Sequence, residues 1–154
     1  MRGYLLDVNH VHAWENKNHG FSERLRKVPA SAPMYVSAVA IGEIEWGHIV
    51  TEPTDTARRS EAKRFMVEHV LSLCLNVTAT TADYYTRILA EIWRRHPPAK
   101  HRGTERHLVE NGVDINDVWA VASAWEHGLV FLTRDGMPVI RESAPEVAFE
   151  NWVA

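Results

Sequence analysis

Residues 113–135 read VDINDVWAVASAWEHGLVFLTRD. Within this stretch, residues 116–127 are strong helix formers or large apolar groups, and Gly128 stands where a helix commonly ends. Residues 129–132 form an apolar run of strand length. The stretch therefore predicts a helix, a tight turn and a buried strand. Apolar residues cover most of the helix circumference, which predicts that the helix packs on more than one side.

Two acids frame this helix and strand. Asp117 lies in the first turn of the predicted helix, where Asp114 can cap the helix and Asp117 can answer it as in a capping box. Asp135 follows the strand, in a sequence typical of a turn. Each acid thus has a structural explanation. A functional explanation requires that other carboxylates reach the same end of the same sheet.

Length and composition place the chain among ordinary globular proteins. The 154 residues predict a single domain, 1–154, and the formal net charge of −3 names no partner. The one cysteine, Cys74, can form no internal disulfide, which predicts a reducing, cytoplasmic location. The apolar run at residues 4–6 is too short for a signal peptide, and no run approaches the length of a membrane span.

Short apolar runs alternate with helical patterns along the chain. We expect strands at residues 3–6, 34–36, 75–78 and 129–132, with a late edge strand at 146–149. We expect helices at residues 8–15, 21–28, 38–50, 57–73, 80–95 and 116–127. Strands that alternate with helices predict a mostly parallel sheet with right-handed crossovers, so that the strand ends meet at one edge.

Four acids occupy similar places in this plan. Asp7 directly follows the first strand, and Glu43 lies in an apolar setting on the helix after the second. With Asp117 and Asp135 they would share the edge of the sheet where ligands bind in open parallel sheets. Four close carboxylates repel one another unless a cation lies among them, and oxygen ligands suit Mg²⁺ or Mn²⁺. Water on such an ion can attack a phosphodiester.

One basic region of the chain could serve binding. The helix ending near residue 95 leads into a polar loop, from about 97 to 112, and this basic region is a candidate phosphate-contacting arm. Its candidate phosphate ligands are Arg94, Arg95, Lys100, Arg102 and Arg106. A merely solvated loop is the alternative.

His10 and His12 would face opposite sides of one helix, so we expect ordinary surface or half-buried residues that share no metal.

Four segments resemble the PIN-domain ribonucleases and, within them, the VapC-type toxins of toxin–antitoxin pairs. They are YLLDVN at residues 4–9, VSAVAIGEI at 36–44, INDVWAVASA at 115–124 and LTRD at 132–135. The resemblance implies a three-layer α/β/α fold with a short, mostly parallel central sheet. Val8 stands where the family usually has Ser or Thr, and the loop at 97–112 is longer than the family pattern.

The resemblance also implies a function. The chain would be the toxin of a type II toxin–antitoxin system, a homodimer that cleaves RNA with Mg²⁺ or Mn²⁺ and is inhibited by a small antitoxin. Asp7, Asp117 and Asp135 would bind the metal, and Glu43 would complete the catalytic set by orienting the attacking water. Asn9 and Asp114 would support these acids.

Two other readings remain open. The sequence around Asp7 and Asn9 approximates the Asp-x-Asp motif of haloacid-dehalogenase-like phosphatases, although Asn9 replaces the second acid. The chain could also be a catalytically inactive RNA-binding domain that keeps the PIN-like fold. Four intact acids argue against this second reading, because an inactive site has no use for charges that repel.

Overall fold

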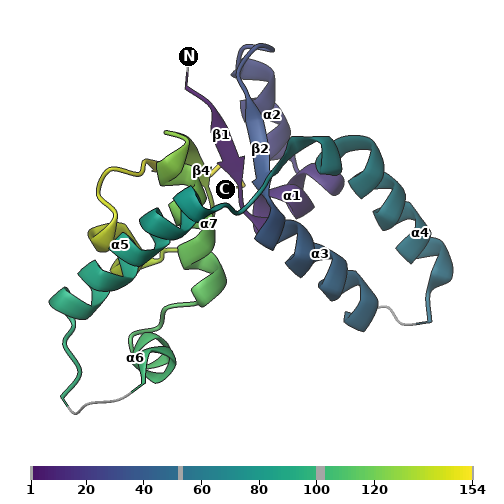
Figure 1. Ribbon diagram of the computed structural model, residues 1–154. Coiled ribbons are helices and arrows are strands. Elements are labelled where there is room, and N and C mark those ends of the chain that lie inside the picture. Colours follow the sequence, from purple (N-terminus) through teal and green to yellow (C-terminus); the bar gives the residue numbers. More distant parts are fainter. Residues whose placement is uncertain (1, 52–53, 100–102, 154) are drawn as a thin grey trace.

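The computed structural model describes residues 2–51, 54–99 and 103–153 (Figure 1). The described strands form one five-stranded sheet in the order β3-β2-β1-β4-β5, and every neighbouring pair is parallel. The strands are β1 Tyr4–Leu6, β2 Met34–Ser37, β3 Cys74–Leu75, β4 Val130–Leu132 and β5 Phe149–Glu150. The expected alternation of strands and helices is confirmed, and the sheet is wholly parallel rather than mostly so.

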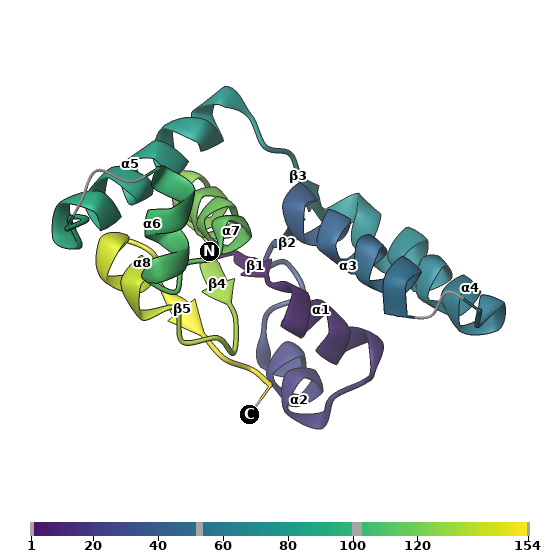
Figure 2. The same ribbon diagram turned by 90° about the horizontal axis from the view of Figure 1, so that it is seen from below.

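Helices cover both faces of this sheet. The helices are α1 Val8–Glu15, α2 His19–Lys27, α3 Ala38–Thr51, α4 Thr56–Phe65, α5 Ala79–Arg95, α6 Thr104–Glu110, α7 Ile115–Glu126 and α8 Pro138–Ser143. Figures 1 and 2 show α1 to α4 on one side and α5 to α8 on the other. The predicted three-layer α/β/α architecture is therefore confirmed.

The alternation of side chains along the short strands divides the core in two. Leu5 and Phe131 point into the cluster that α5, α7 and α8 cover, whereas Leu6 and Leu132 point into the cluster under α1 and α3. All four side chains are almost fully buried. The sheet is thus buried on both faces, as a parallel sheet requires, and only its edges and strand ends remain open to a ligand.

Local capping begins and ends the helices that flank the strand ends. Asp7 caps α1 by accepting from the backbone N–H of Val8 at 2.7 Å, and Asp114 caps α7 by accepting from that of Asn116 at 2.8 Å. After α7, Gly128 adopts φ +61°, which glycine tolerates best. The predicted cap at Asp114 is confirmed. Asp117 makes no hydrogen bond among the described residues, so the capping-box explanation for it is wrong.

The helix expected at residues 57–73 is interrupted. Regular α-helix ends at Phe65, and a π-helical turn, Met66–Val70, precedes a 3₁₀ turn, Leu71–Leu73. The wider turn brings Met66 and Val70 into the core and leaves Val67 largely exposed. A strict 3.6-residue period cannot anticipate this change of face.

The long loop expected at residues 97–112 contains a helix. In α6, Leu108 enters the core cluster under α5 and α7, and His107 is buried against Trp93. The charged residues around these two conceal the apolar face in the sequence. Among the described helices, none is both long and apolar enough to span a membrane.

Candidate functional site

A cavity of about 470 Å³ opens at the carboxyl ends of β1 and β4, between α3 and α7. Its walls are Asp7, Val8, Asn9, His12, Glu43, Trp46, Gly47, Asp117, Arg134 and Asp135. The structure thus brings together all four predicted acids and Asn9. Asp114 does not line the cavity, although its charge acts on Glu43 and Asp117 and raises the pKa of both carboxyls.

Asp7 is the most buried of the four acids, with 7% of its surface exposed. Its Oδ1 caps α1, and its Oδ2 accepts from Thr133 Oγ1 at 2.8 Å and from Asn9 Nδ2 at 3.0 Å. Burial raises the pKa of Asp7, and these hydrogen bonds oppose the rise. The carboxylate is therefore held in one orientation at the end of β1.

Asn9 joins two of the acids. Its Nδ2 donates to Asp7 Oδ2 and to Asp135 Oδ2, both at 3.0 Å. Its Oδ1 lies 2.7 Å from Nδ1 of His10, whose Nε2 accepts from the backbone N–H of Trp152. Nδ1 of His10 must therefore carry the proton and donate to Asn9, which fixes the orientation of the Asn9 amide. Asn9 has the contacts expected of a supporting residue.

The expectation for His10 is wrong in one respect. His10 is fully buried rather than on or near the surface. Burial, and then the charge of Arg134, lower the pKa of His10 to about 4. The ring is neutral at physiological pH and serves as the hydrogen-bonded link between Trp152 and Asn9.

Glu43 approaches the acids from α3. Its Oε1 accepts from Asn116 Nδ2 at 2.6 Å, so the first turn of α7 orients it. Burial raises the pKa of Glu43, and the charges of Asp114 and Asp7 raise it further. The side-chain amide of Asn116 thus connects α7 to Glu43 of α3.

Asp117 has the most perturbed carboxyl in the cavity. Its pKa is raised to about 7, first by burial and then by the charges of Asp7, Asp114, Asp135 and Glu43. Neutral pH therefore leaves Asp117 partly protonated unless a cation compensates the charge. An all-carboxylate donor set of this kind fits Mg²⁺ or Mn²⁺.

The spacing of the acids does not favour direct ligation of one ion by three of them. Among the described residues, no three acids of this cavity have ligand atoms that all lie within 4.8 Å of one another. Mg²⁺ keeps several of its waters when it binds to proteins, so it can bridge carboxylates that are too far apart for direct ligation by all of them.

Sequence reasoning missed Thr133, Asn116 and Arg134. Leu6 pairs with Leu132 across β1 and β4, so Asp7 and Thr133 leave the sheet side by side. Thr133 Oγ1 also accepts from the backbone N–H of Asp135 at 3.1 Å. The position of Thr133 two residues before Asp135 was a usable signal. No sequence pattern indicated which acid Asn116 would contact.

The predicted RNA-contacting residues lie elsewhere. Arg94 and Arg95 both pair with Glu91, at 2.5 and 2.6 Å, and Arg106 pairs with Glu110 at 3.0 Å. None of these three arginines lines the cavity. Lys100 and Arg102 are outside the described residues. Arg134 is the cation on the cavity wall.

Comparisons with protein-family models and with curated protein sequences found no match. Solved structures do match over the full length of the chain. The chain is similar to DNA-bound VapBC from Salmonella typhimurium, with a TM-score of 0.72 and 21% identity over 99% of both chains. It is similar to VapBC-1 from nontypeable Haemophilus influenzae, with a TM-score of 0.67 and 16% identity over 98% of both chains.

A third similar structure is VapBC-5 from Mycobacterium tuberculosis, described as a member of the VapBC family of toxin–antitoxin systems. Its TM-score is 0.56, with 19% identity over the whole of both chains. At these identities the likeness concerns the fold. The chain has the PIN-like α/β/α fold of these VapBC structures, as its four sequence segments predicted.

Proposed function

We propose that the chain is a metal-dependent endoribonuclease and the toxin of a type II toxin–antitoxin system. The observation that carries the proposal is the cavity in which Asp7, Glu43, Asp117 and Asp135 meet. The raised pKa of Asp117, about 7, supports a site built for a cation. The full-length similarity of fold to VapBC structures supports the toxin role.

Asp7, Asp117 and Asp135 would hold Mg²⁺ or Mn²⁺. Such an ion, when bound, polarises a phosphate oxygen and lowers the pKa of a bound water. Thr133 and Asn9 keep Asp7 oriented, and Asn9 also orients Asp135, so these two ligands need little rearrangement. Glu43, held by Asn116, would orient the attacking water.

Arg134 would attract the phosphate. The four acids and the net charge of −3 repel a polyanion, so a local cation is needed beside the reacting group. Arg134 is exposed on the cavity wall, next in sequence to Asp135. The arginines of α5 and α6 would act farther from the reacting phosphate.

An antitoxin and a second copy of the chain are the proposed protein partners. Trp46 is 66% exposed beside the acids, and Ile49 and Val50 extend this apolar surface along α3. A segment of the antitoxin would cover this surface and place an arginine among the acids, where a charge-assisted hydrogen bond replaces the cation. Light scattering of the isolated chain tests the homodimer, and a strict monomer at tens of micromolar contradicts it.

The test is digestion of total RNA with Mg²⁺, with Mn²⁺ and with EDTA. The expected result is cleavage that needs the metal and that Asp117→Asn lowers by about 100-fold or more. Asp83→Asn is the matched control, because Asp83 is exposed on α5 and outside the cavity. Cleavage that survives EDTA or Asp117→Asn would contradict the proposal.

The same material separates the other two readings. A phosphate-monoester assay detects a dehalogenase-like phosphatase, whose second acid is here Asn9, an amide that donates to Asp7. RNA binding without cleavage in either metal would instead favour the inactive RNA-binding domain.

A further inference from the structure

We propose that His12, Glu15 and His48 form a second metal site, specific for a borderline transition ion such as Zn²⁺ and distinct from the acids. One ligand atom from each of these residues lies within 4.8 Å of the other two. In the part of the chain that the structure describes, this is the one group of three or more His, Cys, Asp or Glu side chains that comes so close.

Two helices build the site from their last turns. His12 and Glu15 are three residues apart on α1 and therefore share a face, with His12 Nδ1 3.5 Å from Glu15 Oε2. His48 arrives from α3, and its ring meets that of His12 edge to face at a centroid distance of 6.0 Å. Sequence reasoning considered His12 only together with His10 of the same helix, and it overlooked a partner from another helix.

The core holds these helices in place. Val11 of α1 and Ile44 of α3 are almost fully buried in the same cluster, one residue before His12 and four residues before His48. The three candidate ligands are themselves half-buried. They are thus mounted on rigid elements and remain reachable from solvent, as a metal site requires.

The donor set has the chemistry of a zinc site. Two imidazoles and one carboxylate leave a fourth tetrahedral position open for water. Ligand atoms around Zn²⁺ are about 3.3 Å apart when the metal–ligand bonds are about 2.0 Å long. The atoms in this structure would therefore close by about 1.5 Å at most, which side-chain rotation on fixed helices allows.

The two imidazoles select against the ion that suits the acids. The site borders a cavity of about 570 Å³ that is also lined by Lys17, Arg58, Arg59, Glu61 and Arg64. Four cations and one further acid repel every divalent ion alike, and Mg²⁺, which prefers oxygen ligands, gains little from two imidazoles in return. Imidazole nitrogens suit Zn²⁺, Ni²⁺ and Cu²⁺ better than Mg²⁺, so the type of ligand selects the ion.

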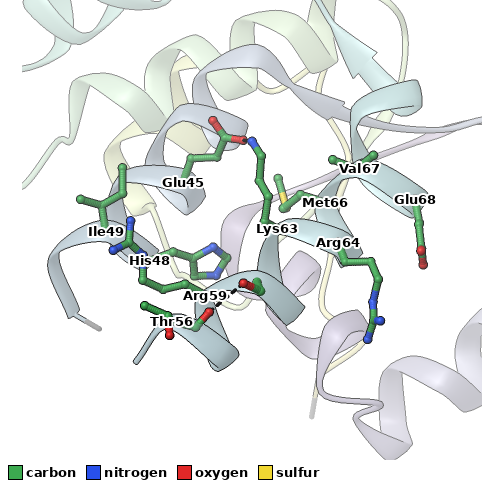
Figure 3. Close-up of a pocket in the computed structure, with 11 residues that line it drawn as sticks. Glu45, His48, Ile49, Thr56, Arg59, Lys63, Arg64, Met66, Val67 and Glu68 are labelled. Carbon is green, nitrogen blue, oxygen red and sulfur yellow. Dashed lines mark hydrogen bonds and ion pairs between the residues drawn. The ribbon is translucent and has the colours of Figure 1, made fainter. Parts of the chain in front are cut away.

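A neighbouring cavity shares residues with this one. His48 and Arg59 also line the cavity of about 730 Å³ between α3 and α4 (Figure 3), where Lys63 pairs with Glu45 at 2.7 Å. On its other side, His12 lines the acid cavity. The proposed site therefore stands between an acidic and a basic region, and an ion bound there would fix the ring of His12 at the rim of the acids.

The experiment is a Co²⁺ titration of the full chain carrying Asp117→Asn, followed by competition with Zn²⁺. We expect the visible absorption of tetrahedral Co²⁺ at one equivalent, displaced by Zn²⁺ and not by Mg²⁺. His12→Gln and His48→Gln should each weaken binding by about 100-fold, and Glu15→Gln by about 10-fold. His19→Gln is the matched control, because His19 is exposed on α2.

Three results would overturn the site. These are binding that survives both His12→Gln and His48→Gln, binding in the wild type that Asp117→Asn abolishes, and no binding below millimolar Zn²⁺. Circular dichroism checks the fold of each variant. As a measurement that needs no substitution, Zn²⁺ should shift the imidazole resonances of His12 and His48 in the wild type and leave those of His19 in place. Neither readout depends on RNA cleavage.

Discussion

The two sides of the acid cavity differ in how their carboxylates are held. On one side, Thr133 and Asn9 bind Asp7, and Asn9 also binds Asp135. On the other side, Asp117 has no hydrogen bond among the described residues, and its pKa rises to about 7. The first side is therefore fixed by hydrogen bonds, whereas the protonation of Asp117 depends on the burial and the charges around it. One acid site thus combines a fixed template of hydrogen-bonded carboxylates with one carboxylate whose protonation depends on its surroundings.

After the loss of an acid itself, the largest effect on cleavage is expected from breaking the hydrogen-bonded side. Thr133→Val keeps the side-chain shape and removes the donor to Asp7 and the acceptor for the Asp135 N–H. We expect RNA cleavage to fall by about 10- to 100-fold, as when a supporting partner of a metal ligand is lost. The rate of RNA digestion at saturating Mn²⁺ measures it. Thr86→Val, at an exposed position on α5, is the control, and equal rates for the two variants would contradict the template.

On the other side, replacing Asp117 should stabilise the metal-free protein. Between its usual pKa of 3.8 and about 7, folded Asp117 binds more protons than it does in the unfolded chain. The metal-free protein therefore loses stability as pH rises through this window. Asp117→Asn should remove the loss and stabilise the metal-free chain by about 1–2 kcal/mol above pH 7, a figure already discounted for solvent screening.

Urea unfolding of both proteins with EDTA, at pH 4.5 and at pH 8, measures this difference. We expect nearly equal stabilities at pH 4.5 and a more stable variant at pH 8. Asp7→Asn is the contrasting variant, because an amide at Asp7 turns a donor toward Asn9 or Thr133 and should destabilise the fold. If Asp117→Asn is less stable than the wild type at pH 8, charge repulsion is not the main effect of Asp117 on stability.

A cation should offset the cost of the Asp117 charge in the wild type. Binding to the folded state alone stabilises it by about 1.4 kcal/mol when the free ion exceeds its dissociation constant tenfold. Thermal melts should therefore show a higher melting temperature for the wild type with millimolar Mn²⁺ than without it. The shift should vanish in Asp117→Asn and persist in the exposed control Asp83→Asn. No shift in the wild type would count against the metal site.

The sequence sufficed for the elements whose signals are local. The apolar runs before Asp7 and Asp135 predicted two buried strands, and Asp114 and Gly128 predicted the ends of α7. The π-helical turn after Phe65 and the helix within 97–112 escaped, because only tertiary packing decides which side chains there are buried. Local signals therefore predicted the layers of the fold better than its irregular parts.

The candidate site was predictable to the same extent. Its four acids follow strands or open helices, so their positions in the chain indicated a common edge. Thr133 reaches Asp7 only because β1 and β4 pair in one register, and His48 reaches His12 only because α1 and α3 pack together. No local sequence pattern indicates either of these two contacts. Sequence reasoning therefore missed these contacts between distant segments, although it identified one residue of each pair, Asp7 and His12.

The smallest effect is expected far from both sides of the cavity. Arg94, Arg95 and Arg106 were predicted to hold RNA, and each already pairs with a glutamate of its own helix. In Figures 1 and 2, α5 and α6 extend away from α3, which supplies Glu43 and Trp46 to the cavity wall. These arginines can add long-range attraction to RNA, but exposed pairs contribute little and are screened by salt.

Replacing all three arginines by Ser should raise the apparent KM for RNA about 2- to 5-fold and flatten its salt dependence, with kcat nearly unchanged. Arg134→Ser removes one cation from the cavity wall itself and should raise KM at least as much as the triple variant does. Steady-state kinetics over a salt series compares the two. If the triple variant retains wild-type kinetics at every salt concentration, the α5–α6 surface is only solvated and RNA is held at the cavity. If it lowers kcat more than Arg134→Ser does, RNA reaches the acids across α5 and α6.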